Sequence, residues 1–386
     1  MTTALKNPFV VIGDIPTEYF CDRVAETRQL VKTITNEGNV VLISPRRMGK
    51  SRLVKHCYKQ SEIEGQYYLF YIDLLHTSSL RELTYTFGLE VFNTMKSQSQ
   101  KAALSLVQAL KSLAGTFGFD ALSGMPTFTV EVGRLSAPDF TLSEIFSWLE
   151  QADKPCLICF DEFQQVSNYP ENKNGEIEAM LRGHIQHMRN ANFIFSGSER
   201  HLLLEMFASK ARPFYNSANI MTLDPIAPDV YCDFAQHWFK AYKKDLDTQE
   251  LHRYYEVLEG STYYLQKLMH EAFINCEPGE TCGKDLLEHT LNEMIEESNE
   301  SFRKQLGSLT ERQKEVLSAI AREGRAQKVL STAFIKKHAL ASTSVVQSAL
   351  KRMMEFGLIT QTAGSYSLTD PLHRLIMLYS VGLKDY

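Results

Sequence analysis

Residues 44–51 combine small, basic and hydroxyl side chains at a spacing that suits phosphate chemistry. Ser44-Pro45-Arg46-Arg47-Met48-Gly49-Lys50-Ser51 fits the pattern G-x-x-x-x-G-K-[S/T] at every position but the first, where Ser stands for Gly. The apolar run Val40–Ile43 precedes it and helical spacing continues from Arg52, which predicts strand, loop and helix. Unpaired N–H groups and the dipole at such a helix N-terminus favour an anion. We therefore expect residues 44–52 to bind the phosphates of a nucleotide.

The residue types within this loop predict separate roles. Gly49 lets the backbone approach a phosphate that a side chain would hold away. Lys50 can reach the β- and γ-phosphate oxygens, and the Ser51 hydroxyl can ligate Mg²⁺. Arg46 and Arg47 either contact the phosphates or a neighbouring domain, or lie at a solvated loop tip. The alternative to a nucleotide site is a chance match in a turn, which the flanking strand and helix disfavour.

A second apolar run, Cys156–Phe160, ends in the acidic pair Asp161-Glu162 about 110 residues downstream of the loop. Alone, such a strand end is routine, but a phosphate loop needs a carboxylate of this kind on a neighbouring strand. Asp161 would hold Mg²⁺, and Glu162 would polarise the attacking water. Together the two motifs predict binding of ATP or ADP with Mg²⁺. They also predict hydrolysis, with Lys50 and Glu162 as catalytic residues.

Length and composition set limits on the class of protein. The 386 residues, 44% of them hydrophobic, suit two or three globular domains. With 41 Lys+Arg against 46 Asp+Glu, the formal charge of −5 gives no global attraction to nucleic acid or to an anionic membrane. No apolar run approaches the roughly 20 residues of a membrane span, and the seven cysteines suit a reducing compartment, so we expect a cytoplasmic protein. Cys156 and Cys159 would lie on opposite faces of a strand, as buried apolar residues rather than metal ligands.

Apolar strands alternate with helices through the first part of the chain. This order predicts an α/β fold with a parallel five-stranded sheet covered on both faces, and a site at the carboxyl ends of the strands. Ser196 and Ser198 follow the strand Asn192–Phe195, where either could sense the γ-phosphate or cap a helix. We divide the chain into a nucleotide-binding domain at 1–226, with a hairpin-like insertion near 115–133, an all-helical lid domain at 227–308 and a third domain at 309–386.

The third domain has the element order of a winged helix. Three helices, at about Thr310–Glu323, Ser331–His338 and Ser342–Phe356, precede two short strands around a glycine turn in Leu358–Leu368. The third helix would enter a DNA groove with Lys351 and Arg352 on its polar face, but Thr360–Ser367 carries no Lys or Arg. DNA and a protein partner both remain open for this domain.

The chain resembles the archaeal-type ATPase family of P-loop proteins, close to the STAND branch of the AAA+ class. The resemblance rests on Pro45–Ser51 and on Asp161-Glu162-Phe163-Gln164. Weaker matches are Cys21-Asp22-Arg23, where the family has Gly-Arg-Glu near the base, and Arg212–Tyr215, where it has Pro-Leu-Tyr-x-Arg. The resemblance implies that Arg23 contributes to nucleotide binding, that Arg212 contacts the γ-phosphate, and that Ser196 and Ser198 act as sensors.

Such a protein would be a signalling ATPase and a molecular switch. Its nucleotide state would change the angle between the sheet domain, the helical lid and the winged helix, and self-association is possible. The alternative is a binding module or DNA-binding regulator in which nucleotide is a ligand with negligible turnover. Replacing Glu162 would distinguish the two alternatives, because it should impair ATP turnover by a hydrolase and do little to a passive binder.

Overall fold

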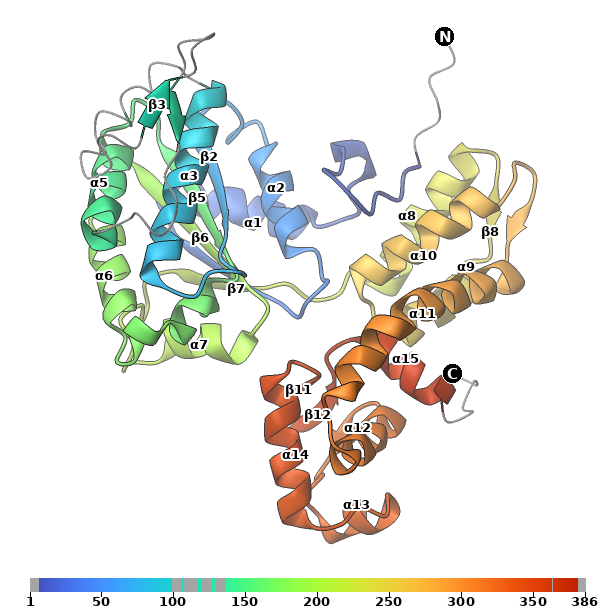
Figure 1. The fold of residues 1–386 in the computed structure, drawn as a ribbon. Helices are drawn as coiled ribbons and strands as arrows, with labels where there is room; N and C mark the ends of the chain where they lie inside the picture. Colours follow the sequence, from blue (N-terminus) through green and yellow to red (C-terminus); the bar gives the residue numbers. More distant parts are fainter. Residues whose placement is uncertain are drawn as a thin grey trace. The chain divides into compact units, whose positions relative to one another are not determined.

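The computed structural model describes residues 7–98, 106, 117–119, 126–128, 137–362 and 364–380. These residues form two compact units, which are treated separately below (Figure 1). The first is Asp14–Asp224, and the second combines residues 7–13 with those from Pro225 onward. Within the described ranges, no helix is long and apolar enough to cross a membrane.

The first unit contains the predicted sheet of five parallel strands, in the order β2-β5-β6-β1-β7. The strands are β1 Val40–Ile43, β2 Tyr68–Asp73, β5 Cys156–Asp161, β6 Ala191–Gly197 and β7 Asn219–Thr222. The α/β fold class is therefore confirmed. Because β6 lies between β1 and β5, the carboxyl ends of these three strands are neighbours on one edge of the sheet. The segments that directly follow β1, β5 and β6 therefore meet at this edge.

Helices cover both faces of the sheet (Figure 1). One face packs against α3 Leu80–Gln98, α5 Pro138–Gln151, α6 Glu176–Ile185 and α7 Arg200–Ala208, and the other against α1 Val24–Ile34 and α2 Lys50–Tyr58. Successive strand residues alternate between the two apolar cores, since side chains of a strand point to opposite faces. Cys156 belongs to one core and Cys159 to the other, as expected, and burial raises the pKa of the Cys156 thiol to about 12.

The first unit also contains a hairpin and, before α6, short 3-10 helices. The hairpin is present as β3 Phe117–Phe119 paired antiparallel with β4 Pro126–Phe128, and the rest of the 115–133 insertion lies outside the described residues. Short 3-10 helices, η4 Phe163–Asn168 and η5 Pro170–Asn172, precede α6. Asn172 explains where α6 starts, because its side-chain oxygen accepts the N–H groups of Ile177 at 3.0 Å and Glu178 at 3.2 Å.

The second unit begins with helices, as predicted: α8 Pro228–Ala241, α9 Thr248–Val257, α10 Thr262–Asn275 and α11 Lys284–Gly307. The expectation that this region is entirely helical is wrong. Strand β8, Asp245–Leu246, pairs in parallel with β9, Thr281–Cys282, and two residues are too few to show a strand period in the sequence. Phe9 joins this unit from the start of the chain, with its ring 5.8 Å from that of Phe239.

The winged helix is confirmed. It consists of α12 Glu311–Glu323, α13 Thr332–Lys337, α14 Thr343–Glu355 and the antiparallel strands β11 Ile359–Thr362 and β12 Ser365–Leu368, followed by α15 Pro371–Ser380. Thr310, Ser331 and Ser342 cap the three helices through side-chain oxygens, which is why the sequence placed their starts well. A short third strand, β10 Ala326–Gln327, pairs with β12 and was not expected.

A buried hydrogen bond ties helix α10 to the segment after β12. The Tyr264 hydroxyl on α10 donates to Asp370 Oδ2 at 2.8 Å. Asp370 Oδ1 also accepts the Leu372 N–H at 3.0 Å, which fixes the start of α15. The division of this unit at residues 308 and 309 remains a proposal.

Candidate functional site

The loop between β1 and α2 has the backbone shape of an anion cradle. Arg47 has a φ of 66° and Gly49 a φ of 89°, both in the left-handed region. Turns of this kind direct successive N–H groups into one concavity. A Cβ at Gly49 would meet nothing within 4 Å, so glycine is needed there for its backbone conformation rather than for packing. Lys50 then begins α2, and the loop ends at a helix N-terminus as expected.

Lys50 is held against the start of its own loop. Its Nζ donates to the backbone oxygens of Ser44 at 3.2 Å and Pro45 at 3.3 Å, and to Ser44 Oγ at 3.4 Å. Ser44 thus supplies a side-chain oxygen that the usual glycine could not, a role that the sequence did not reveal. Burial lowers the pKa of Lys50, and the nearby carboxylates of Glu162 and Asp161 oppose that shift.

Ser51 and Asp161 meet across two chain segments. Ser51 Oγ donates to Asp161 Oδ2 at 2.9 Å, and the hydroxyl of Tyr71, on the adjacent strand β2, donates to the same oxygen. Burial raises the pKa of Tyr71, with the Asp161 charge adding to it, so Tyr71 stays a neutral donor. A hydroxyl beside a carboxylate is an oxygen donor set that fits Mg²⁺. Sequence reasoning missed Tyr71, because an aromatic residue in an apolar strand carries no functional signal.

Glu162 connects the end of β5 to the end of β6. Its Oε2 accepts hydrogen bonds from Ser198 N at 3.2 Å, from Ser198 Oγ at 2.8 Å and from Gln164 Nε2 at 2.6 Å. Arg46 Nε in turn donates to Ser198 Oγ at 3.3 Å, which brings the phosphate loop into the same cluster. Ser196 lies fully buried in β6, and its hydroxyl has no hydrogen-bond partner among the described residues.

Comparison with known proteins decides the family. The family of ATPase domains found predominantly in Archaea matches residues 20–268, which is more than half of the chain. The protein is a member of this archaeal-type ATPase family. A model of a probable winged helix domain matches residues 300–378. The curated proteins offer no significant match to the ATPase.

Solved structures with the same fold cover nearly the whole chain. The Walker-type ATPase paby2304 of Pyrococcus abyssi is 20% identical, with a TM-score of 0.67, and the similarity spans 96% of this chain and 99% of that one. The Aeropyrum pernix ORC2 protein, solved in ADPNP and ADP complexes, is 13% identical over 98% of both chains, with a TM-score of 0.60. These similarities support the fold of the ATPase, and the family match identifies it as a P-loop ATPase.

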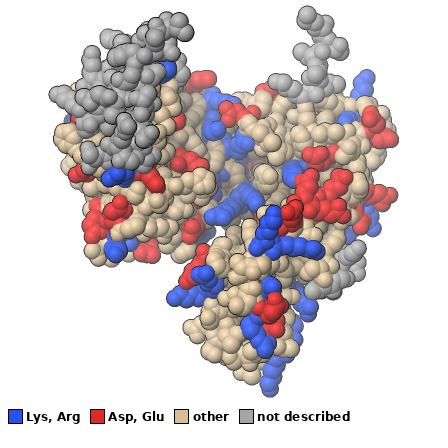
Figure 2. All heavy atoms as spheres, in the orientation of Figure 1, with Lys and Arg blue, Asp and Glu red and all other residues tan. Residues whose placement is uncertain are grey.

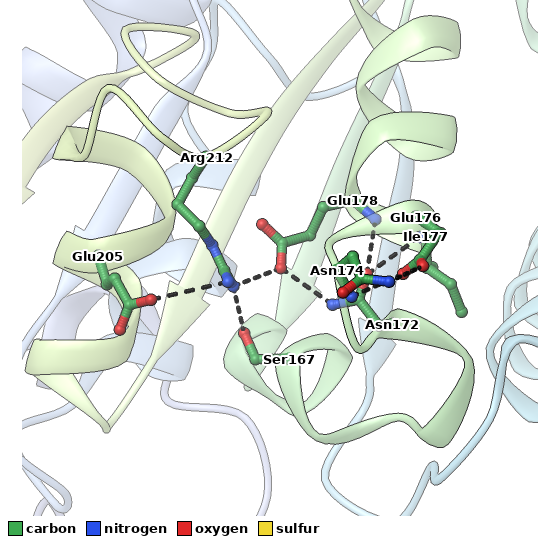
Figure 3. A network of polar contacts seen from close by, with 8 residues as sticks. All are labelled: Ser167, Asn172, Asn174, Glu176, Ile177, Glu178, Glu205 and Arg212. Atoms are coloured by element: carbon green, nitrogen blue, oxygen red, sulfur yellow. Dashed lines mark hydrogen bonds and ion pairs between the residues drawn. The ribbon is translucent and has the colours of Figure 1, made fainter.

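Arg212 lies in a different network from the loop residues (Figure 3). Its Nη2 contacts Glu178 Oε1 at 2.5 Å and Ser167 Oγ at 3.3 Å, and its Nη1 lies 3.6 Å from Glu205 Oε1. None of these partners belongs to residues 44–52 or to the Asp161-Glu162 pair. The structure therefore gives Arg212 a structural partner, the fully buried Glu178 side chain, rather than a place among the phosphate-loop contacts.

The segment expected to border the base packs against α2. The Phe20 ring stacks on His56 with centroids 3.8 Å apart. Arg23 is 5% exposed, has a left-handed φ of 64° and pairs through Nη1 with Glu26 Oε1 at 2.7 Å. Its Nη2 has no hydrogen-bond partner among the described residues, so the guanidinium retains a donor for another group.

Proposed function

We propose that this ATPase binds ATP with Mg²⁺ at residues 44–52 and hydrolyses it as a nucleotide-dependent switch. One observation carries the proposal. The loop residues Lys50 and Ser51, the carboxylates of Asp161 and Glu162 and the hydroxyl of Ser198 form one connected set of charges and hydrogen bonds, although they come from three separate strand ends.

The residues divide the work by their chemistry. The N–H groups around Gly49 and the ammonium of Lys50 hold the β- and γ-phosphates, and Ser51 and Asp161 hold the metal ion. When bound, Mg²⁺ would supply a positive charge that stabilises the charge developing on the transferred phosphoryl group. Glu162 orients the attacking water and accepts its proton.

We assign the output of the switch to the winged helix, with a protein as the favoured partner. On α14, Arg352 pairs with Glu355 at 3.1 Å and covers the Phe356 ring at 4.0 Å, and Lys337 on α13 pairs with Glu323 at 2.6 Å. Basic and acidic side chains are interspersed over the winged helix on the face shown in Figure 2. Lys337 and Arg352 are thus held in ion pairs, and the wing segment Thr360–Ser367 carries no Lys or Arg, so DNA is the second candidate. Self-association and the place near the STAND branch are parts of the same proposal.

Phosphate release tests this function. Wild type, Lys50→Ala and Glu162→Gln are compared with Mg·ATP, each with and without duplex DNA. Turnover by wild type alone, lost in both variants, supports an ATPase. Equal background rates in all three proteins contradict hydrolysis and leave a passive binder. A rate that rises with DNA only in wild type would assign the winged helix to DNA instead of a protein.

A further inference from the structure

Gln164 makes a contact that the proposed reaction does not yet use. It lies two residues after Glu162, at the start of η4, and its side chain is fully buried. Its Nε2 donates to Glu162 Oε2 at 2.6 Å. Its other polar atom, Oε1, is buried and has no hydrogen-bond partner among the described residues.

The neighbouring strand makes room for this amide. Gly197 ends β6, and a Cβ built on it would lie 2.1 Å from Gln164 Oε1 and 3.2 Å from Gln164 Cδ. Gly197 does not have a positive φ, so the backbone conformation is not what requires glycine. Glycine weakens a strand and marks places where another group approaches closely. Here the nearest group is the Gln164 amide, and Leu203 Cδ1 is the next, 2.8 Å from the built Cβ.

The arrangement is a poor one for stability alone. A buried amide oxygen without a partner destabilises a folded protein by roughly 1–3 kcal/mol, and an apolar side chain of similar length would avoid that loss. What the amide does provide is a donor to the Glu162 carboxylate. Phe163 and Val166, both fully buried, anchor the same short helix in the core, so this donor is fixed in place. The other side-chain donor to Glu162 is the Ser198 hydroxyl, which also accepts a hydrogen bond from Arg46. A movement of the phosphate loop would therefore change the contact between Ser198 and Glu162.

We propose that Gln164 is a positioning residue for the general base, holding the Glu162 carboxylate at the end of β6, and that Gly197 is glycine in order to seat it. This inference rests on the proposed hydrolysis of ATP. A catalytic group displaced by about 1 Å can lose up to a hundredfold in rate, so loss of this donor is expected to lower kcat by about ten- to a hundredfold. ATP binding, which depends on the loop, is expected to stay within about twofold, because the amide does not contact the loop.

Gln164→Met tests the inference, since it removes the donor and keeps an unbranched side chain of similar length. Gln165→Met, the next residue in η4, is the matched control, and Glu162→Gln is the reference for loss of the base. For each variant, kcat, the Kd for Mg·ATP and the thermal midpoint are measured. We expect a large drop in kcat for Gln164→Met but not for Gln165→Met, at unchanged Kd. The thermal midpoint should stay close to that of wild type, because losing the hydrogen bond to Glu162 offsets the removal of the unpartnered amide oxygen.

Gly197→Ala tests the same contact from the β6 side. The added methyl group displaces the flexible end of Gln164 and is expected to lower kcat as Gln164→Met does. A Gln164→Ala background removes the amide and leaves Leu203 Cδ1, 2.8 Å from the added Cβ, so the same change should lower kcat by less there than it does in wild type. Equal effects of Gly197→Ala in both backgrounds overturn the link between the two residues.

The outcomes separate the two proposals. If Glu162→Gln abolishes turnover while Gln164→Met and Gly197→Ala keep the wild-type kcat, the positioning role is wrong and the ATPase stands. A rise in kcat in Gln164→Met also overturns it, because the amide would then restrain the base. If wild type releases no phosphate, or Glu162→Gln is as active as wild type, the proposed function itself fails, and the positioning role with it.

Discussion

Ser51 Oγ and Asp161 Oδ2 lie 2.9 Å apart although 110 residues separate them in the chain. Ser51 stands in the first turn of α2 and Asp161 is the last residue of β5. Their meeting depends on the strand order, because β6 spaces the two strands so that a helix following β1 reaches the end of β5. This pair provides the proposed metal ligands.

Replacing the carboxylate should remove the metal dependence of nucleotide binding. We expect Asp161→Asn to weaken binding of ATP in the presence of Mg²⁺ by at least about tenfold, or 1.4 kcal/mol, and to change it little in EDTA. Asp73→Asn is the control, since Asp73 pairs with Asp161 in the strand register but is exposed. Titration calorimetry in both buffers measures the effect. Equal losses with and without Mg²⁺ would show that Asp161 is not a metal ligand.

Tyr71 should contribute stability through its bond to Asp161. A hydrogen bond to a charged group contributes roughly 1.5–3 kcal/mol, so Tyr71→Phe is expected to lower the free energy of unfolding by about that amount without metal. Tyr58→Phe is the comparison, because the Tyr58 hydroxyl donates to the neutral backbone oxygen of Phe70 at 2.9 Å and should matter less. Urea unfolding measures both. Combining Tyr71→Phe with Asp161→Asn should give less than the sum, and full additivity would refute the contact.

Lys50 should lower the free energy of unfolding, although it is proposed to bind the nucleotide. Because burial lowers its pKa in the folded state, the charged form opposes folding in full below that pKa, and the effect fades as pH rises through it toward the ordinary value of 10.5. We expect Lys50→Met to unfold at a higher temperature than wild type at pH 7, with the difference shrinking by pH 10. Lys32→Met, at an exposed position on α1, should show neither effect. Lower stability of Lys50→Met at pH 7 is the contrary result.

Replacing Arg212 should destabilise the folded protein more than replacing Glu162. Removing it leaves the fully buried Glu178 carboxylate without its ion pair, and such losses reach about 3–5 kcal/mol. We therefore expect Arg212→Met to unfold at much lower urea than Glu162→Gln, and Arg212→Met with Glu178→Gln to recover part of the loss. If Arg212→Met abolishes phosphate release at a wild-type urea midpoint, Arg212 acts on the nucleotide instead.

The Glu178 carboxyl adds a pH dependence to the same pair. Burial raises its pKa, while Asn172 and Arg212 oppose the shift. A carboxyl with a raised folded-state pKa stabilises the fold below its ordinary pKa and loses that contribution as pH rises through the folded value. Without Arg212 the pKa rises further, so the loss in Arg212→Met should be smaller at pH 5 than at pH 8. A loss that does not change with pH would contradict this account.

The main features of the fold could be predicted because they rest on continuous segments. Val40–Ile43 and Cys156–Phe160 show buried strands directly, and the serine and threonine caps fix the helices of the winged helix. Contacts made across strands leave no such pattern, so the bond from Tyr71 to Asp161 and the fit of Gln164 against Gly197 appear only in three dimensions. The two-residue strands β8, β9 and β10 could not be predicted for a simpler reason, because an alternating pattern needs more residues than they contain.

Binding of Mg·ATP to wild type and to Lys50→Ala tests the central claim most directly. Both proteins are titrated by calorimetry, with their folded state checked by thermal unfolding. The account predicts saturable binding to wild type, one nucleotide per chain, and an affinity at least about tenfold weaker for Lys50→Ala. Equal affinity in the two folded proteins, or no binding to wild type, would contradict it.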